Sequence, residues 1–267
     1  MNLVRYPTFL LAAAIAFRLI IGPAIGTSYA QEDIEGLEEQ AMREAVDRVA
    51  ASVVRLDTVG GSESVGGKLI GSGPTTGLVV SEDGFIASSA FNFVQNPTSI
   101  LVTLPNGKRA PAQIVARDTA RALVLLKVET DQKLTVPKVV PRDKLMVGQW
   151  TIAVGRTAGE VPNRSVGILS ATNRIWGRAV QTDANVSPSN YGGPLIDIRG
   201  DVIGILVPLS PQQKSELAGA EWYDSGIGFA VPSGDVMSRL ETMKQGNALN
   251  ARSLRIPLKG TAIHALP

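Results

Sequence analysis

The spacing of hydrophobic and polar positions changes near residue 51. From Glu32 to Ala51 the apolar positions fall on one face of a helix, and charged residues occupy most of the other positions. The apolar residues of this face are Leu37, Ala41, Ala45, Val46 and Val49. From Ser52 onward the apolar runs are short and separated by turn residues. The pattern predicts an N-terminal helix over residues 31–51, followed by a region built of strands.

The strands fall into two sets, joined by a proline-containing segment. In the first set, Asp83-Gly84 and Asn106-Gly107 lie between apolar runs and predict hairpins. Near the C-terminal end, Ser233 suits the N-cap of a short helix. The predicted units are a first β-barrel (52–130), a linker (131–147), a second β-barrel (148–232), a C-terminal helix (233–245) and a tail without clear period (246–267).

The first 30 residues differ in composition from the rest of the chain. Arg5 gives a positively charged start, and Thr8 to Ile25 is mostly apolar, although Arg18 interrupts it. Ser28-Tyr29-Ala30 fits a cleavage site. These features predict a secretory signal peptide over residues 1–30, and hence a periplasmic or secreted protein. The alternative is that the apolar segment 8–25 is retained as a membrane anchor.

Composition excludes several classes of site. Of the 26 basic residues, two (Arg5 and Arg18) lie in the first 30 positions, so the remaining 24 balance the 24 acidic residues. Without a basic excess we expect no nucleic-acid partner. The chain has no cysteine and one histidine, His264, so disulfides, a cysteine nucleophile and a histidine-rich metal site are excluded. No cofactor is predicted.

Residues 181–195 read QTDANVSPSNYGGPL. This segment resembles the nucleophile loop of HtrA-type (trypsin-like) serine proteases, which reads Q-T-D-A-x-x-N-P-G-N-S-G-G-P-L. Five more segments resemble family motifs in the same order: Ser81–Ile86, Ala116–Lys127, Gly148–Gly155, Ser165–Ala171 and Gly226–Pro232. The resemblance covers about residues 50–240. It implies an all-β, chymotrypsin-like fold with two six-stranded antiparallel barrels and short N- and C-terminal helices.

The resemblance also locates the three positions of the family's catalytic triad. Phe91 stands at the histidine position, Ala122 at the aspartate position and Tyr191 at the serine position. A nucleophilic serine needs a base within hydrogen-bond reach and an acid that orients the base. None of these three side chains supplies that chemistry, and His264 lies in the tail. The sequence therefore predicts a pseudoprotease without catalytic residues.

The remaining residues of the loop are expected to form a vestigial oxyanion and peptide-binding site. Ser189 replaces a family glycine whose N–H helps to form the oxyanion hole, so its side chain would distort the hole if the glycine needed an unusual conformation. Asn185 stands where related enzymes place the floor of the specificity pocket, or is a solvated loop residue. Together the loop residues are Asn185, Ser189, Asn190, Tyr191, Gly192 and Gly193.

Phe91 and Tyr191 are expected to lie side by side at the old catalytic centre. They would form an aromatic surface for a peptide, plug the site, or simply pack together. Three function classes stay open. The first is a non-catalytic envelope protein that binds peptides or unfolded proteins, or forms homo- or heterotrimers with HtrA-type proteases. The second is an active HtrA-class endopeptidase with non-standard catalytic residues.

The third class is a structural envelope component, for which the inserted segment Gln212–Trp222 offers a surface. A length of 267 residues leaves little room for a further peptide-binding domain of ordinary size, so no PDZ domain is expected.

Overall fold

The computed structural model describes the two barrels and the segments that join them. The described residues are 26–60, 64–65, 68–69, 74–94, 96–159, 161–209 and 226–249, with side chains described for all except 26–33, 64–65 and 68–69. The predicted features at residues 1–25, Gln212–Trp222 and His264 lie outside this part of the chain. Within the described part, no helix is both long enough and apolar enough to cross a membrane.

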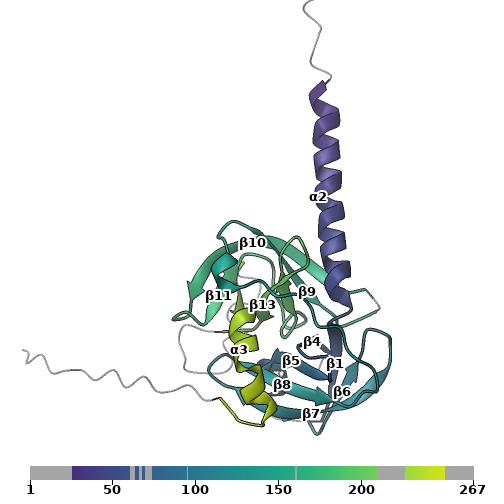
Figure 1. Ribbon diagram of the computed structural model, residues 1–267, viewed down its shortest axis with the longest axis vertical. Coiled ribbons are helices and arrows are strands. Elements are labelled where there is room, and N and C mark those ends of the chain that lie inside the picture. The colour runs from purple at the N-terminus through teal and green to yellow at the C-terminus, as the bar shows by residue number, and fades with distance from the viewer. Residues whose placement is uncertain are drawn as a thin grey trace, which may run out of the picture. The chain divides into compact units, whose positions relative to one another are not determined.

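The first helix, α2 (Gly26–Ala50), begins before the predicted range and ends one residue short of it (Figure 1). Of the apolar face predicted from the sequence, only the last two turns are buried: Ala45, Val46 and Val49 are at most 1% exposed. Leu37, in the compact unit Met1–Arg43, is 58% exposed, whereas Ala45, Val46 and Val49 belong to the unit Glu44–Pro267.

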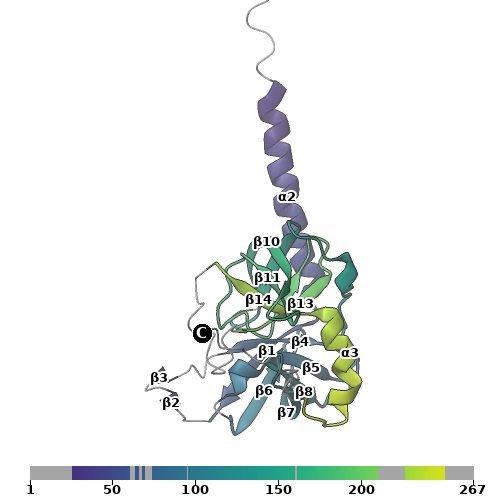
Figure 2. The same cartoon turned by 90° about the vertical axis from the view of Figure 1, so that its left-hand side faces the viewer.

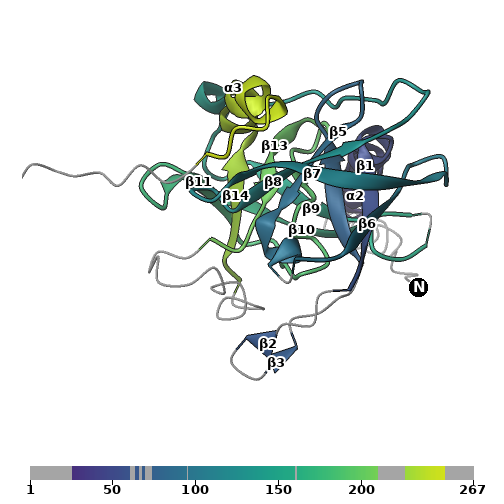
Figure 3. The same ribbon diagram turned by 90° about the horizontal axis from the view of Figure 1, so that it is seen from below.

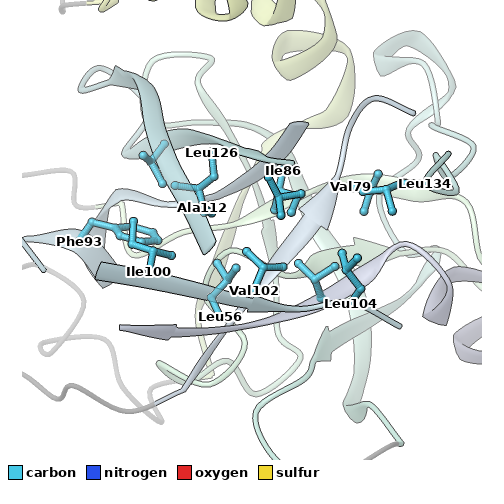
Figure 4. Packing of buried hydrophobic residues seen from close by; sticks show 13 residues of the cluster. Leu56, Val79, Ile86, Phe93, Ile100, Val102, Leu104, Ala112, Leu126 and Leu134 are labelled. Atoms are coloured by element: carbon cyan, nitrogen blue, oxygen red, sulfur yellow. The ribbon is translucent and has the colours of Figure 1, made fainter. Parts of the chain in front are cut away.

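The first barrel closes in the strand order β1-β4-β5-β8-β7-β6. Its strands are β1 (Val53–Val59), β4 (Thr75–Val79), β5 (Phe85–Ser89), β6 (Ser99–Thr103), β7 (Arg109–Asp118) and β8 (Leu123–Val128). Alternate residues of the strands point inward and pack as a core of valine, leucine and isoleucine (Figure 4). Phe93, on the 3₁₀ turn η1 (Ala90–Phe93), fills one end of this core and is fully buried.

The second barrel closes in the order β10-β11-β14-β13-β12-β9. Its strands are β9 (Trp150–Gly155), β10 (Asn163–Arg174), β11 (Ala179–Thr182), β12 (Pro194–Ile196), β13 (Val202–Leu206) and β14 (Gly228–Pro232). All strand pairs in both barrels are antiparallel. The predicted all-β fold of two six-stranded barrels is therefore confirmed. Two short strands, β2 (Ser64–Val65) and β3 (Lys68–Leu69), pair separately.

The linker and the C-terminal helix hold the barrels together. In the linker, which includes η2 (Arg142–Lys144), the Val140 N–H donates to the Val202 carbonyl at 2.8 Å, beside the start of β13. Helix α3 (Ser233–Lys244) packs on β13 and β14 of the second barrel and on β7 of the first (Figures 2 and 3). Ser233 is not the N-cap: it is the first helical residue, and its hydroxyl donates to the Val140 carbonyl at 3.1 Å.

Truncating Phe93 should test the core of the first barrel. Because its ring is fully buried, we expect Phe93→Ala to lower the free energy of unfolding by about 3–5 kcal/mol. The control Met146→Ala removes a side chain that is 67% exposed and should change it by less than about 0.5 kcal/mol. Urea unfolding followed by circular dichroism measures both. Equal effects of the two variants would contradict the assignment of Phe93 to the core.

Candidate functional site

The segment that connects β11 to β12, residues 183–193, is called the Tyr191 loop below. It is fastened to the first barrel by two neighbouring threonines of β4. The Thr75 hydroxyl donates to the Tyr191 carbonyl at 3.0 Å, and the Thr76 hydroxyl donates to the Ser189 carbonyl at 2.8 Å. Thr76 Oγ1 also accepts the Arg156 N–H at 2.7 Å, at the end of β9. The loop therefore bridges the two barrels.

Asn190 organises the interior of the loop. It is 6% exposed, and its side-chain oxygen accepts the Ser187 N–H at 3.2 Å while its side-chain nitrogen donates to Asn163 at 3.1 Å. The hydroxyls of Ser187 and Ser189 lie 2.6 Å apart and bond each other. These serines are thus held by hydroxyl and amide groups, none of which is a general base.

Two glycines allow the loop to approach both barrels closely. Gly192 has a φ of +86°, a conformation that disfavours any side chain. A Cβ on Gly192 would also collide with the Ser88 hydroxyl and the Thr76 carbonyl, and one on Gly193 would collide with the Val154 carbonyl. Ser189, by contrast, does not have a positive φ. Ser189 therefore has no backbone strain of the kind that a glycine-only conformation would have imposed.

The three triad positions meet where η1, the start of β8 and the Tyr191 loop come together. The Ser89 hydroxyl accepts the Phe91 N–H at 3.3 Å and so shapes η1. The Ala90 N–H donates to the Ala122 carbonyl at 2.7 Å, which places the turn beside β8. The rings of Phe91 and Tyr191 then lie edge to face, with centroids 5.4 Å apart and planes at 80°. Such a pair contributes about 0.5–1.5 kcal/mol beyond its buried area.

Tyr191 belongs to the interior rather than to the surface. It is 4% exposed and packs in the core cluster of the second barrel, with Phe91 packed against the same cluster. The Asn92 side-chain amide donates to the Tyr191 carbonyl at 3.1 Å and fixes the backbone at this point. Of the arrangements expected from the sequence, this burial favours a plugged centre over an exposed aromatic surface.

A pocket of about 280 Å³ lies between the barrels at α3, and a second one of about 250 Å³ adjoins Tyr191. The second pocket is lined by Val186, Tyr191, Val207, Pro208, Leu209, Ile227, Gly228 and Phe229. Apart from the tyrosine hydroxyl, its side chains are apolar. Asn185 is exposed and does not line the pocket, so it is the solvated loop residue rather than a polar floor.

The described part of the chain lacks two kinds of group that many hydrolases use. Its residues include no histidine and no group of three potential metal ligands. A serine–lysine contact occurs between Ser81 and Lys244, at 3.1 Å. The same Lys244 nitrogen pairs with Glu241 at 3.2 Å and lies 5.0 Å from the Phe85 ring centre, so it contacts several groups besides the serine.

Asp118 is an acidic residue four positions before Ala122, and it forms ion pairs within the fold. It is fully buried, and its carboxylate lies 3.5 Å from Arg239 on α3 and 3.9 Å from Arg121. Burial raises the pKa of Asp118, and the charges of the two arginines oppose that shift. Its ion-pair partners are thus arginines that hold α3 on the first barrel.

Comparison with known proteins agrees with this architecture. Residues 75–205 match the family described as a trypsin-like peptidase domain. A relative from Chlamydia trachomatis is described as a "Probable periplasmic serine endoprotease DegP-like" protein, and it is 35% identical to the chain over 164 residues. The match covers 59% of this chain and 31% of the relative. The chain carries a trypsin-like peptidase domain of the HtrA type. A second relative with the same description, from Halomonas elongata, is 33% identical over 66% of this chain and 36% of its own length.

The similarity extends further along the chain in a third relative, the putative serine protease HhoB of Synechocystis. It is 29% identical over 217 residues, which is 70% of this chain and 49% of the relative. The chain thus spans about a third to a half of the length of these relatives. Their names describe peptidases, whereas this chain carries Phe91, Ala122 and Tyr191 at the positions that the resemblance of its motifs assigns to the triad.

Sequence reasoning located the loop but missed the residues that hold it. Thr75, Thr76, Asn92 and Asn163 bond the Tyr191 loop although they lie between 27 and 116 positions away in sequence. Each sits in or next to a strand whose pattern predicted only a buried or turn position. No local signal distinguishes a threonine that bonds another barrel from one that merely suits a strand.

Gly192 offers a test of the close approach between the loop and the first barrel. We expect Gly192→Ala to lower the free energy of unfolding by about 1–2 kcal/mol from its left-handed φ and by about 1–3 kcal/mol more from the collision. Gly107 has a similar φ of +81° but open space around it, so Gly107→Ala should show only the first cost. Urea unfolding compares the two variants. If both lost the same stability, the close contact would be ruled out.

Proposed function

We propose that this chain is a non-catalytic, HtrA-like protein of the cell envelope that binds polypeptide segments. The observation that carries the proposal is the burial of Tyr191, at the nucleophile position, against Phe91 at the base position. A phenyl ring exchanges no proton, and a tyrosine hydroxyl has an ordinary pKa of about 10. Neither side chain supports acyl transfer.

The pocket beside Tyr191 supports a binding role. Apart from the tyrosine hydroxyl, the side chains that line it are apolar, so it suits an apolar side chain of a ligand. Val207 and Leu209, which follow strand β13, form one wall of the pocket. An extended segment lying along this wall would place alternate side chains toward the pocket. The ligand class that fits is therefore an extended polypeptide with an apolar residue.

The cellular location and the assembly of the protein are part of the same proposal. We propose export through a signal peptide over residues 1–30, and periplasmic names of relatives support this location. The protein would act on its own or by joining an active HtrA-type relative in a mixed oligomer. The competing proposal is an active endopeptidase with non-standard catalytic residues, which rests on the peptidase names of the relatives.

The first test is proteolysis. We expect casein incubated with the protein to stay intact for days, as judged by mass spectrometry of the products. Tyr191→Ser should not create activity, because the base position holds Phe91 and the described residues include no histidine. Specific fragments produced by the parent protein and lost in Tyr191→Ala would overturn the non-catalytic proposal and support the competing one.

The second test is binding of an unfolded chain. Val186, 9% exposed, lines the pocket beside Tyr191, and Val186→Thr keeps its shape while adding a hydroxyl. Placing a hydroxyl against an apolar ligand costs about 1–3 kcal/mol, so we expect affinity for reduced, fluorescently labelled casein to fall about tenfold. Fluorescence anisotropy measures this affinity.

The matched control for this test is Val161→Thr. Val161 is 70% exposed and does not line the pocket, so its affinity for casein should equal that of the parent protein. Thermal unfolding checks that both variants fold. Equal affinities of the two variants would show that the pocket is not the binding site.

A further inference from the structure

Four arginines from separate parts of the chain gather beside the N-terminal half of α3. Arg121 follows β7, Arg142 lies on η2, Arg178 ends the turn between β10 and β11, and Arg239 lies on α3. Figure 1 shows α3 between the two barrels, the region in which these elements meet. We call these four residues the arginine cluster. None of them lines the pocket beside Tyr191.

Two carboxylates connect the cluster. Asp235, in the first turn of α3, pairs with Arg121 at 3.2 Å and with Arg142 at 3.4 Å. The buried Asp118 pairs with Arg239 at 3.5 Å and with Arg121 at 3.9 Å. Arg121, whose side chain is 13% exposed, thus joins both carboxylates. Each carboxylate is shared, so the two acids hold Arg121, Arg142 and Arg239 close together, while Arg178 bonds the Ala120 carbonyl next to Arg121.

The cluster has more positive than negative charge. Its four guanidinium groups face two carboxylates among the described residues. Burial and the neighbouring charge of Arg121 lower the pKa of Arg178, as expected where positive charge is not fully compensated. Asp143, beside Arg142, is exposed and makes no ion pair with the cluster in this part of the chain. The segment 250–267 contains basic residues but no acidic ones.

Several donors of the cluster are unused within the described residues. Arg121 Nε is buried without a hydrogen-bond partner. Arg178 donates through Nε to the Ile175 carbonyl and through Nη1 to the Ala120 carbonyl, which leaves Nη2. Arg239 has an ion pair with Asp118 but no hydrogen bond, and its side chain is 35% exposed. A site with surplus positive charge and several unused N–H groups is suited to an anion.

We propose that the arginine cluster binds a phosphate or sulfate group. Guanidinium forks match the tetrahedral oxyanions with paired N–H donors, and a second charge on the anion balances the surplus of the site. Trp176, 71% exposed and 5.4 Å from the Arg178 guanidinium, borders the site with a flat apolar surface. The group comes from a free phosphate or from a phospholipid headgroup.

The test is titration of the purified full chain with inorganic pyrophosphate by isothermal calorimetry, at ionic strength held constant with sodium chloride. We expect saturable binding to the parent protein and at least tenfold weaker binding to Arg239→Gln. Sedimentation with phosphatidylglycerol vesicles, against phosphatidylcholine vesicles, separates the two sources of the phosphate group. Binding of pyrophosphate identifies a free-phosphate site, and Arg239-dependent binding of only the anionic vesicles identifies a headgroup site.

The control variant is Arg174→Gln. It removes the same charge from an exposed arginine close to Arg178 that has no ion pair in the described part of the chain. It should bind like the parent protein. Both variants change partly exposed side chains, and thermal unfolding without ligand verifies that they fold. The proposal is overturned if neither probe binds, or if Arg174→Gln weakens binding as much as Arg239→Gln.

Discussion

The attachment of the Tyr191 loop to β4 is the constraint on which the centre of this molecule depends. Two adjacent hydroxyls of one strand, Thr75 and Thr76, hold two carbonyls of the loop across the boundary between the barrels. Gly192 permits the approach because it has no Cβ. Each neutral hydrogen bond contributes only about 0.5–1.5 kcal/mol, but a carbonyl left unpaired in this buried region would cost about 1–3 kcal/mol. The loop therefore has one favourable position.

In that position Phe91 and Tyr191, which the resemblance assigns to the base and nucleophile positions, pack edge to face. Two rings in this arrangement are stabilised by burial and by the attraction between the edge of one ring and the face of the other. The backbone around them forms a well-ordered loop with an adjoining pocket, while the two rings pack with the core of the second barrel.

Helix α3 also connects the two barrels, but through ion pairs instead of neutral hydrogen bonds. Asp118 is buried and would be costly to ionise alone; its arginine partners, which come from α3 and the β7–β8 turn, compensate it. Because Arg121 serves two carboxylates, the β7–β8 turn, η2 and α3 are held as one unit. The same arrangement concentrates arginines from both barrels, and the surplus charge that results follows from the fold rather than from any single segment.

The sequence by itself determined the order of the motifs, the two sets of strands, and the identity of Phe91, Ala122 and Tyr191. These are local properties, since alternation, turn residues and a motif each need only a few neighbouring positions. Only the tertiary structure decided which apolar residues are buried: Leu37 shares a helix face with Val49, yet it is exposed and Val49 is not. It also decided that Tyr191 lies in the core and that four distant arginines meet. The burial of a residue and the balance of charge around it depend on all the elements that pack beside it, and closure of the barrels brings those elements together. A single segment of the sequence therefore does not determine them.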